Sequence, residues 1–510
     1  MTEGNKNLDL DTVYVNSSKD DFIEAEGLKL LKPPKGFGVR HTVALMAFFG
    51  SIISYCMRIN LSMAIVDMTY DNGTSDDSSD SADSCPVDDS GNSTTTSTGE
   101  FPWSSSDKGL ILGAFFWGYV VAHIPAGNLA EKYGAKWVFG IGILITAIFQ
   151  LLTPVITRWG GDDYSMTAII VLRVIQGLGE GVTPPATHAL LAQWAPPFER
   201  SKMGSFVYAG NQGGTMCAMI ISGAIINADF LGGWPGVFYT FGILALVWLA
   251  AWSYLVHSKP SQHPRISQEE LQYIQGSMSG QTTTKRMSTP WKQILRSRAV
   301  WAIVAAQLGN GWGLYTLLTY MPTYMSSVLH FDIKDNSLLS ALPYFCMLSA
   351  ALITSWVADM LRTKRIFSTT NTRRLFNCIG HWGPAVALIG AAYTGCDKVL
   401  TVVLLTVTVA LSGTVGAGYQ INHIDIAPNH AGTLMGFCNG ISNLAGIAAP
   451  YVAGLITTDE SSLASWRIVF FLASGIYFLD NLIYVIFVSG QEQPWNRPPE
   501  ETQEEKKQEE

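Results

Sequence analysis

Three ionisable side chains lie inside long apolar stretches of this sequence, where their types suit the binding of ions. Arg58 is enclosed by the apolar residues 52–65, and Arg173 and Glu180 belong to the segment LRVIQGLGEGVTPP. A charge at the centre of a bilayer costs about 2.5 to 3.5 kcal/mol on insertion scales, so such residues mark candidate functional sites. Two arginines beside one glutamate leave a positive excess that a bound anion could neutralise.

The spacing within the second segment places an acid on the same helix face as an arginine. Arg173 and Glu180 are seven residues apart, which corresponds to about two helical turns, or about 10.5 Å. We interpret the two arginines as ligands of a small anion. Glu180 would then bind the coupling cation, either by taking up a proton or by contacting sodium. The alternative is an ion pair that only locks helices together.

Other polar residues in apolar stretches are weaker candidates for lining the site. A lone histidine or amide inside a membrane is also a common hydrogen-bonded packing element, so both interpretations stay open. These residues are Gln176, His123, His188 and His381. Asp480 has no visible partner in the sequence, and we interpret it as structural or solvent-reaching.

The composition indicates that a lipid bilayer surrounds most of the chain. Of 510 residues, 48% are hydrophobic and 14% charged, and the mean hydropathy is +0.21. The net charge of −8 comes from the tails and from residues 71–100, so no nucleic-acid partner is expected. The seven cysteines show no metal-ligand spacing, so neither a metal site nor a disulfide framework is expected. Cys85 and Cys396, both in predicted outer loops, are the one pair that could bridge.

Twelve apolar stretches are long enough to cross a hydrocarbon layer about 30 Å thick as helices. We therefore predict an all-α membrane protein of twelve transmembrane helices in two six-helix pseudo-repeats. The stretches begin near His41, Lys108, Trp137, Met166, Met203, Val237, Ala299, Ser337, Leu375, Val399, Gly432 and Trp466.

The distribution of basic residues predicts that both tails are cytoplasmic. Five of the 32 Lys and Arg residues fall in odd-numbered loops and two in spans, and the others fall in even-numbered loops and the tails. The predicted parts are a tail (1–40), a six-helix bundle (41–257) with an outer loop (68–106), a linker (258–298), a second bundle (299–489) and a tail (490–510).

The long outer loop carries two glycosylation sequons, Asn72-Gly-Thr and Asn92-Ser-Thr. We expect enzymatic deglycosylation to lower the apparent mass of the protein, because this loop is long, polar and on the outer side. Gel electrophoresis of a variant with Asn72→Gln and Asn92→Gln should show no such change. A mass change that persists in the double variant would contradict the predicted topology.

The two halves of the chain carry matching segments. WAPPFERSKMG (194–204) matches IAPNHAGTLMG (426–436), and GNLAEKYGAK (127–136) matches SWVADMLRTK (355–364). Parallel repeats of this kind place a substrate site between the halves, near mid-membrane. The second match predicts a cytoplasmic gate whose salt bridges break as the halves move. Its residues are Gly127, Glu131, Lys132, Lys136 and Asp359.

These segments also carry a resemblance to a known family. GNLAEKYGAK resembles the signature of the major facilitator superfamily, and RVIQGLGEGVTPPATHALLAQWAPPFERSKM with NHIDIAPNHAGTLMGF resembles the anion:cation symporter family within it, over residues 37–492. That family includes sodium-dependent phosphate cotransporters, sialin and the vesicular glutamate transporters. The resemblance implies that Arg58, Arg173 and Glu180 serve the substrate and the coupling ion.

Departures from the family pattern narrow the expected substrate. Gln176 stands where sialin-like carriers have a second acid, and Asn310 and Leu112 stand where vesicular glutamate carriers have an arginine and a histidine. Asn310 stays a candidate for lining the site. We predict sodium-dependent cotransport of inorganic phosphate or a small organic anion. The alternative is a proton-coupled carrier of acidic sugars or glutamate-like anions.

Other functional classes fit the sequence less well. A channel or receptor does not require a two-fold repeat with paired gating segments, and no HExxH or GxSxG motif indicates an enzyme. We expect a monomer without a cofactor, with sodium or a proton as the coupling ion. Its location would be the plasma membrane or an endolysosomal or vesicular membrane.

Overall fold

Long helices make up most of the computed structural model, which describes residues 34, 36–69, 85, 99–159, 161–278, 289–427 and 430–496. The first half contains α1 (Val39–Met68), α2 (Ser105–Tyr133), α3 (Ala135–Trp159), α4 (Gly161–Gly181), α5 (Thr183–Trp194), α6 (Pro197–Asn227) and α7 (Trp234–Leu255). The short α8 (Gln268–Met278) and α9 (Trp291–Ile294) follow. The second half contains α10 (Arg298–Ser327), α11 (Ile333–Thr363), α12 (Thr369–Ala392), α13 (Lys398–Ser412), α14 (Tyr419–Ile426), α15 (Ala431–Ser442), α16 (Leu444–Ile456) and α17 (Leu463–Phe487).

Within the described residues these helices form twelve segments of membrane-spanning length, because α4–α5, α13–α14 and α15–α16 are each one interrupted segment. The predicted starts lie within six residues of the observed ones, with the largest differences at Pro197 and Thr369. By length and hydropathy alone, eight of the segments qualify as membrane spans. The four that fall short contain α2, α6, α10 and α15–α16.

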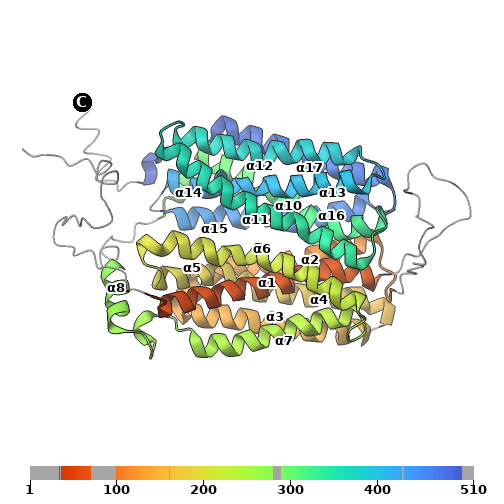
Figure 1. Ribbon diagram of the computed structural model, residues 1–510, viewed down its shortest axis with the longest axis horizontal. Coiled ribbons are helices and arrows are strands. Elements are labelled where there is room, and N and C mark those ends of the chain that lie inside the picture. The colour runs from red at the N-terminus through yellow and green to blue at the C-terminus, as the bar shows by residue number, and fades with distance from the viewer. Residues whose placement is uncertain are drawn as a thin grey trace, which may run out of the picture.

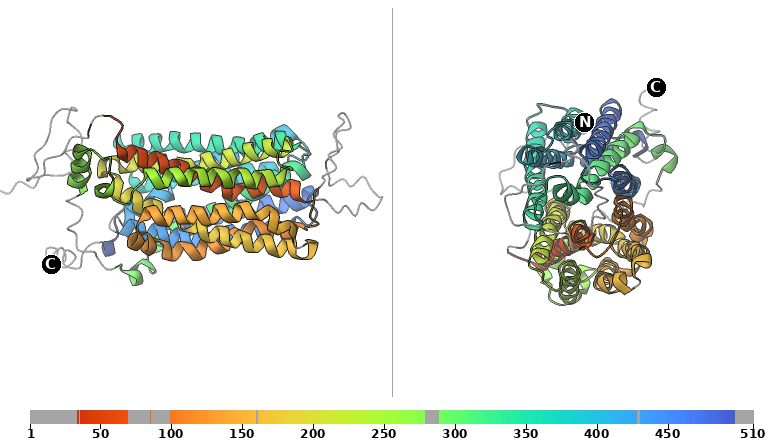
Figure 2. Two further views of the ribbon diagram at one scale, coloured as in Figure 1. Left: turned by 90° about the horizontal axis from the view of Figure 1, so that it is seen from below. Right: turned by 90° about the vertical axis from the view of Figure 1, so that its right-hand side faces the viewer.

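The two halves lie side by side when the molecule is viewed along its helices (Figure 2, right). Helix α2 packs on α16 and α6 packs on α11, so these two pairs form most of the seam between the halves. Small residues permit this close approach: a Cβ on Gly109 would lie 2.6 Å from the carbonyl oxygen of Pro450. This packing explains why three of the four less apolar segments lie along the seam, where lipid contact is reduced.

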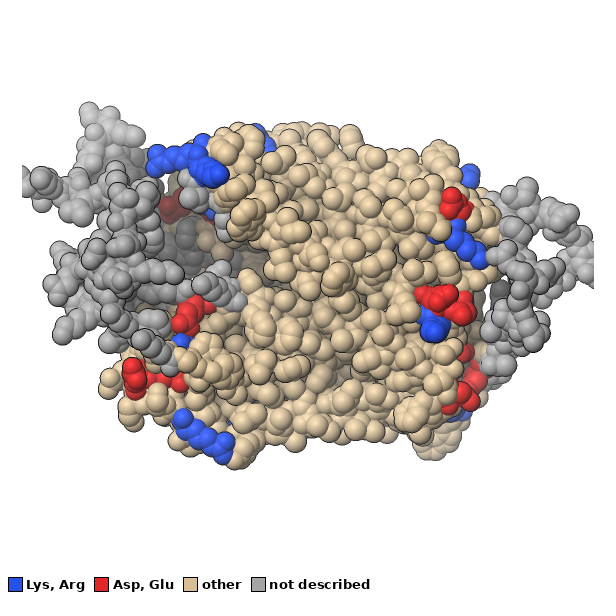
Figure 3. All heavy atoms as spheres, viewed as in Figure 1, with Lys and Arg blue, Asp and Glu red and all other residues tan. Residues whose placement is uncertain are grey.

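The chain has two polar ends separated by a belt of uncharged side chains (Figure 3). We call the end that holds Met68 and Ser105 the loop end, and the end that holds Val39 and Phe487 the terminal end; they lie at the right and left of Figure 1. The uncharged belt matches what a hydrocarbon layer requires of a protein surface.

An ionic contact closes the seam at the loop end. Lys108 of α2 donates to both carboxylate oxygens of Glu460 at 2.9 Å, and Ser327 of α10 donates to the same carboxylate at 3.3 Å. The hydroxyl of Ser105 also donates to Glu460. Glu460 therefore ties the start of α2 in the first half to α10 in the second.

A disulfide joins Cys85 to Cys396, whose Cα atoms are 5.4 Å apart. Cys85 belongs to the loop between α1 and α2, and Cys396 belongs to the turn between α12 and α13. The pair that the sequence left open is thus bridged, and the bridge links the outer loop of one half to the other half. The predicted glycosylation sites Asn72 and Asn92 lie outside the described residues.

Candidate functional site

A proline pair interrupts the fourth membrane segment next to Glu180. Helix α5 begins at Thr183 and contains Pro184 and Pro185, which lack the backbone N–H that would bond to the carbonyls of Glu180 and Gly181. The Thr183 hydroxyl donates to the carbonyl of Glu180 at 2.8 Å in place of the missing backbone bond. The interruption thus places Glu180 at the end of α4.

Glycine brings α4 close to α2 on the face that carries the charged residues. A Cβ on Gly177 would collide with the carbonyl oxygen of Phe115, so only glycine permits this helix distance. The sequence LRVIQGLGEG therefore serves two purposes. Its glycines set the packing, and its charged residues face α1.

Arg58 and Glu180 form a buried ion pair. Nη2 of Arg58 lies 3.2 Å from Oε2 of Glu180, and Nε donates to the same oxygen at 3.2 Å. The Ser54 hydroxyl donates to this oxygen at 3.0 Å, whereas Oε1 has no partner within the described part of the chain. Both charged side chains are buried.

Arg173 faces the same stretch of α1 but meets no carboxylate in its described contacts. Its Nη2 donates to the carbonyl of Arg58 at 2.9 Å, and its Nη1 donates to Oε1 of Gln176 at 3.0 Å. Nε is buried without a partner among the described residues. The trio of Arg58, Arg173 and Glu180 therefore carries one positive charge in excess.

Aromatic rings enclose the two guanidinium groups. Phe115 lies between them, with its ring centre 5.0 Å from the Cζ atoms of both Arg58 and Arg173. Tyr55 and Tyr119 place their rings 4.5 and 4.6 Å from Cζ of Arg58. Cation–π contacts stabilise guanidinium charge without neutralising it, so the site still attracts an anion.

The structure places the weaker candidates at different distances from this trio. His123 stacks on Tyr119 at 5.6 Å and so lies one ring away from Arg58. His188 lies on α5 nearer the terminal end, with its ring centre 5.2 Å from that of Tyr208 in a tilted arrangement, and the residue is exposed.

Both amide candidates are engaged in hydrogen bonds. Besides accepting from Arg173, Gln176 donates to the hydroxyl of Thr153 at 3.1 Å. Asn310, on α10 of the other half, accepts from the Tyr419 hydroxyl at 3.3 Å, while its Nδ2 is buried without a partner among the described residues.

Two of the predicted gating residues can be placed. Lys136 is buried and donates to the carbonyl of Ser253 on α7 at 2.7 Å, and Lys132 is exposed with its Nζ 5.2 Å from the ring centre of Tyr133. Gly127, Glu131 and Asp359 belong to helices, but their side chains lie outside the described residues. The proposed gating role of this group stays a prediction.

The sequence reasoning missed the aromatic residues of the site. Phe115, Tyr119 and His123 are spaced four residues apart, and Ser54 and Arg58 have the same spacing, so each set shares one helix face. This spacing could have connected them with Arg58. The sequence shows no partner for Asp480, but in the structure Nε2 of His381 lies 3.5 Å from its Oδ2.

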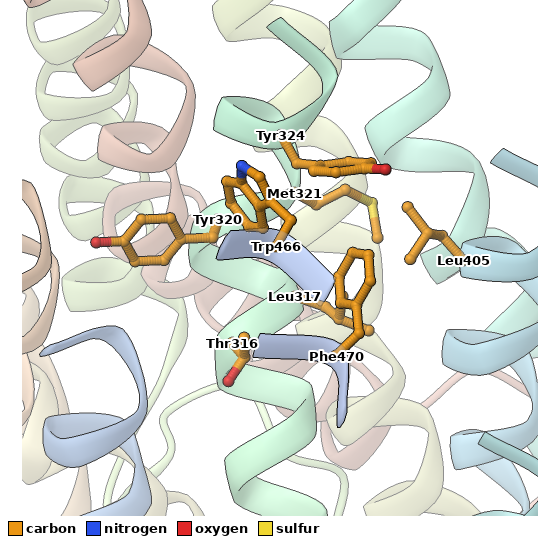
Figure 4. Close-up of a pocket in the computed structure, with 8 residues that line it drawn as sticks. All are labelled: Thr316, Leu317, Tyr320, Met321, Tyr324, Leu405, Trp466 and Phe470. Atoms are coloured by element: carbon orange, nitrogen blue, oxygen red, sulfur yellow. The ribbon is translucent and has the colours of Figure 1, made fainter. Parts of the chain in front are cut away.

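A separate pocket lies between α10, α13 and α17 (Figure 4). Aromatic and aliphatic side chains surround it and none of its residues is charged, so it does not suit an anion. Its lining consists of Thr316, Leu317, Tyr320, Met321, Tyr324, Leu405, Trp466 and Phe470.

Comparisons with known proteins show the family and the fold of this chain. A sequence profile of the Major Facilitator Superfamily matches residues 47–450. The "Putative inorganic phosphate cotransporter" of Drosophila melanogaster is 44% identical over 480 residues, which cover 92% of this chain and 89% of that protein. Sialin of Homo sapiens is 41% identical over 460 residues, covering 89% and 90%.

A solved structure shares the fold. It is a bacterial homolog of the human lysosomal transporter Spinster in an inward-facing, unoccupied conformation, with a TM-score of 0.65 and 13% identity. The match covers 88% of this chain and 98% of that one. At this identity the likeness concerns the fold alone.

Proposed function

This chain belongs to the Major Facilitator Superfamily, within the family of sialin and the phosphate cotransporters, and from that membership we propose that it cotransports inorganic phosphate with a cation. It is a multi-pass membrane transporter. We propose alternating access, in which a site between the halves opens to one side of the membrane at a time. We propose sodium, rather than a proton, as the coupling ion.

The observation that carries this proposal is the positive excess in the buried trio. Arg58 is paired with Glu180, whereas Arg173 donates only to neutral oxygen atoms in its described hydrogen bonds. A buried unpaired charge is costly, and an anion with several oxygen atoms would offset that cost by accepting from both guanidinium groups. Phosphate has such oxygen atoms and is small enough for a site lined by large rings.

Glu180 is the proposed link between anion and cation. When phosphate binds Arg58, the carboxylate of Glu180 can release that arginine and take up sodium or a proton. The Oε1 atom, which has no partner among the described residues, is free to accept either ion. Cation binding and anion binding would then favour each other, as symport requires.

A proton-coupled carrier of organic anions is the second candidate. The aromatic rings of Tyr55, Phe115 and Tyr119 offer apolar surface for the body of an organic anion. His123, stacked on Tyr119, could exchange a proton near the site.

Uptake into proteoliposomes tests the proposal. The purified protein should accumulate radiolabelled phosphate in a saturable manner under an inward sodium gradient. Accumulation of phosphate under a proton gradient alone would reassign the coupling ion. If sialic acid or glutamate is accumulated and phosphate is not, the second candidate is correct, and unsaturable flux would indicate a channel.

The contact between Lys108 and Glu460 yields a prediction about a second gate, at the loop end of the seam. Glu460→Gln removes the carboxylate that holds Lys108, which should weaken closure by about 1 kcal/mol and raise the open population roughly fivefold. Hydrogen–deuterium exchange at the start of α2 should become faster. Glu100→Gln is the matched control, because Glu100 pairs with Arg158 inside the first half. Equal exchange in Glu460→Gln and the wild type would remove this contact from the gate.

A further inference from the structure

A second buried acid lies in the other half of the molecule. Asp480 of α17 is 6% exposed, and neither of its carboxylate oxygens accepts a hydrogen bond from the described residues. It packs directly on α10, where a Cβ on Gly309 would collide with the carboxylate. A bare carboxylate in such surroundings costs several kcal/mol, so the structure must compensate its charge.

His381 of α12 is the neighbour that can do so. Its Nε2 lies 3.5 Å from Oδ2 of Asp480 and 3.1 Å from the carbonyl oxygen of Ala306, and its Nδ1 lies 3.0 Å from the carbonyl oxygen of Asn377. The ring is fully buried. A neutral imidazole has one N–H and can donate to only one of these carbonyls, whereas an imidazolium can donate to both.

The charges around the pair require one additional proton. Neutral His381 beside ionised Asp480 would leave a bare negative charge, and one proton on either residue makes the pair neutral overall. Among the described residues, the other titratable groups facing the pair are the phenols of Tyr419 and Tyr477, whose rings lie 6.0 and 5.7 Å from the His381 ring. Helix α10 contributes the neutral Asn310.

Both permanent cations of α12 lie toward the start of the helix. Arg373 and Arg374 precede His381 by eight and seven residues, or about 12 and 10.5 Å along the helix. Arg373 pairs with Asp425 at 2.7 Å, and among the described residues neither arginine forms an ion pair with Asp480. A proton is therefore the cation that this geometry provides for Asp480.

We infer that His381 and Asp480 form a proton-binding site in the second half, separate from Glu180, that gains and loses one proton during transport. The inference rests on the transport function proposed above. The pair takes a proton from water on one side of the membrane and releases it on the other. The sequence offers His381 only as a weak candidate for lining the substrate site, and it assigns Asp480 no role in binding.

An interrupted segment beside the pair offers the movement that proton exchange requires. The segment α13–α14 is broken at residues 413–418, and there the Thr414 hydroxyl donates to the carbonyl of Phe376 on α12 at 3.0 Å. Interrupted membrane helices are typical of ion sites in transporters. Tyr419, directly after the break, links the His381 ring to Asn310 through its hydroxyl.

Helix α10 connects this pair to the anion site. Its Ala306 and Gly309 contact the pair. Its Tyr315 contacts Phe116 of α2, next to Phe115 of the anion site, with ring centres 4.6 Å apart. A shift of α10 on protonation would therefore reach the site between the halves.

Asp480→Asn tests the inference directly. Infrared difference spectroscopy of the purified protein across a pH titration should show a protonated-carboxyl band that is absent in Asp480→Asn and retained in Glu180→Gln. In proteoliposomes, Asp480→Asn should exchange phosphate while losing the additional accumulation that an inward proton gradient gives on top of the sodium gradient. Ser474→Ala is the matched control, because Ser474 also joins α17 to α12, through the Ala385 carbonyl at 3.1 Å, and does not titrate.

A spectrum of Asp480→Asn identical to that of the wild type would overturn the inference. If Asp480→Asn does not fold, His381→Gln provides the test. The pH at which the protonated-carboxyl band disappears should then differ from that of the wild type. An unchanged pH would refute the proposed pairing of His381 with Asp480. The infrared result does not depend on the substrate. A wild-type protein that moves no phosphate but shows the Asp480 band would therefore refute the proposed function and support the proton site.

Discussion

Arg58→Lys is expected to reduce phosphate transport about 10- to 100-fold, because lysine keeps the charge but loses the planar fork that contacts Glu180 and three aromatic rings. The loss of one charge-assisted hydrogen bond, worth about 1.5 to 3 kcal/mol, accounts for this range. The same guanidinium would bind the oxygen atoms of the anion. Initial uptake rates in proteoliposomes, at equal protein content, measure the effect.

Arg158→Lys is the matched control for this substitution. Arg158 also pairs with a glutamate, Glu100, but the pair lies at the loop end and is 44% and 38% exposed. Exposed ion pairs contribute little, so transport should stay near the wild-type rate. If Arg58→Lys folds and transports like Arg158→Lys, Arg58 is a structural residue and the anion site must lie elsewhere.

Glu180→Gln is expected to abolish cation-driven accumulation of phosphate while exchange of internal for external phosphate continues. The amide keeps an oxygen that can accept from Arg58 and Ser54, so the helix contacts can persist. It carries no charge and mimics the protonated acid, so the cation can no longer change the affinity for the anion. Counterflow and gradient-driven uptake, measured on the same vesicles, separate the two activities.

Ser54→Ala controls for the loss of a contact to the same carboxylate oxygen. It removes the hydrogen bond of 3.0 Å without changing the charge, and accumulation should continue. A Glu180→Gln protein that concentrates phosphate as steeply as the wild type would make Glu180 a structural partner of Arg58. The coupling cation would then bind at another site.

Much of the fold could be predicted from the sequence, and the predicted family and fold class are confirmed. The hydrocarbon layer has a known thickness and a helix has a fixed rise, so the length of an apolar stretch is enough to identify a span. The interruptions within three of the segments were harder to predict. Pro184 and Pro185 indicate the interruption in the fourth segment, whereas no proline lies at the break between α13 and α14.

The candidate site could be predicted only in part. The rarity of charged residues in apolar stretches pointed to Arg58, Arg173 and Glu180, and their spacing placed the last two on one face. Neither property specifies how helices rotate against one another. The sequence therefore could not show that Arg58 pairs with Glu180, or that Phe115 lies between the arginines.

Properties that depend on residues close together in the sequence could be predicted from it. Contacts between residues far apart in the sequence could not. Span length, helix-face spacing and the bias of basic residues all follow from local geometry and from the cost of placing charge in lipid. The pairing of His381 with Asp480 and the bridge between Cys85 and Cys396, 311 residues apart, depend on which helices pack together and at what angle. Many side chains along the whole seam determine that packing jointly, so only the folded molecule brings these groups together.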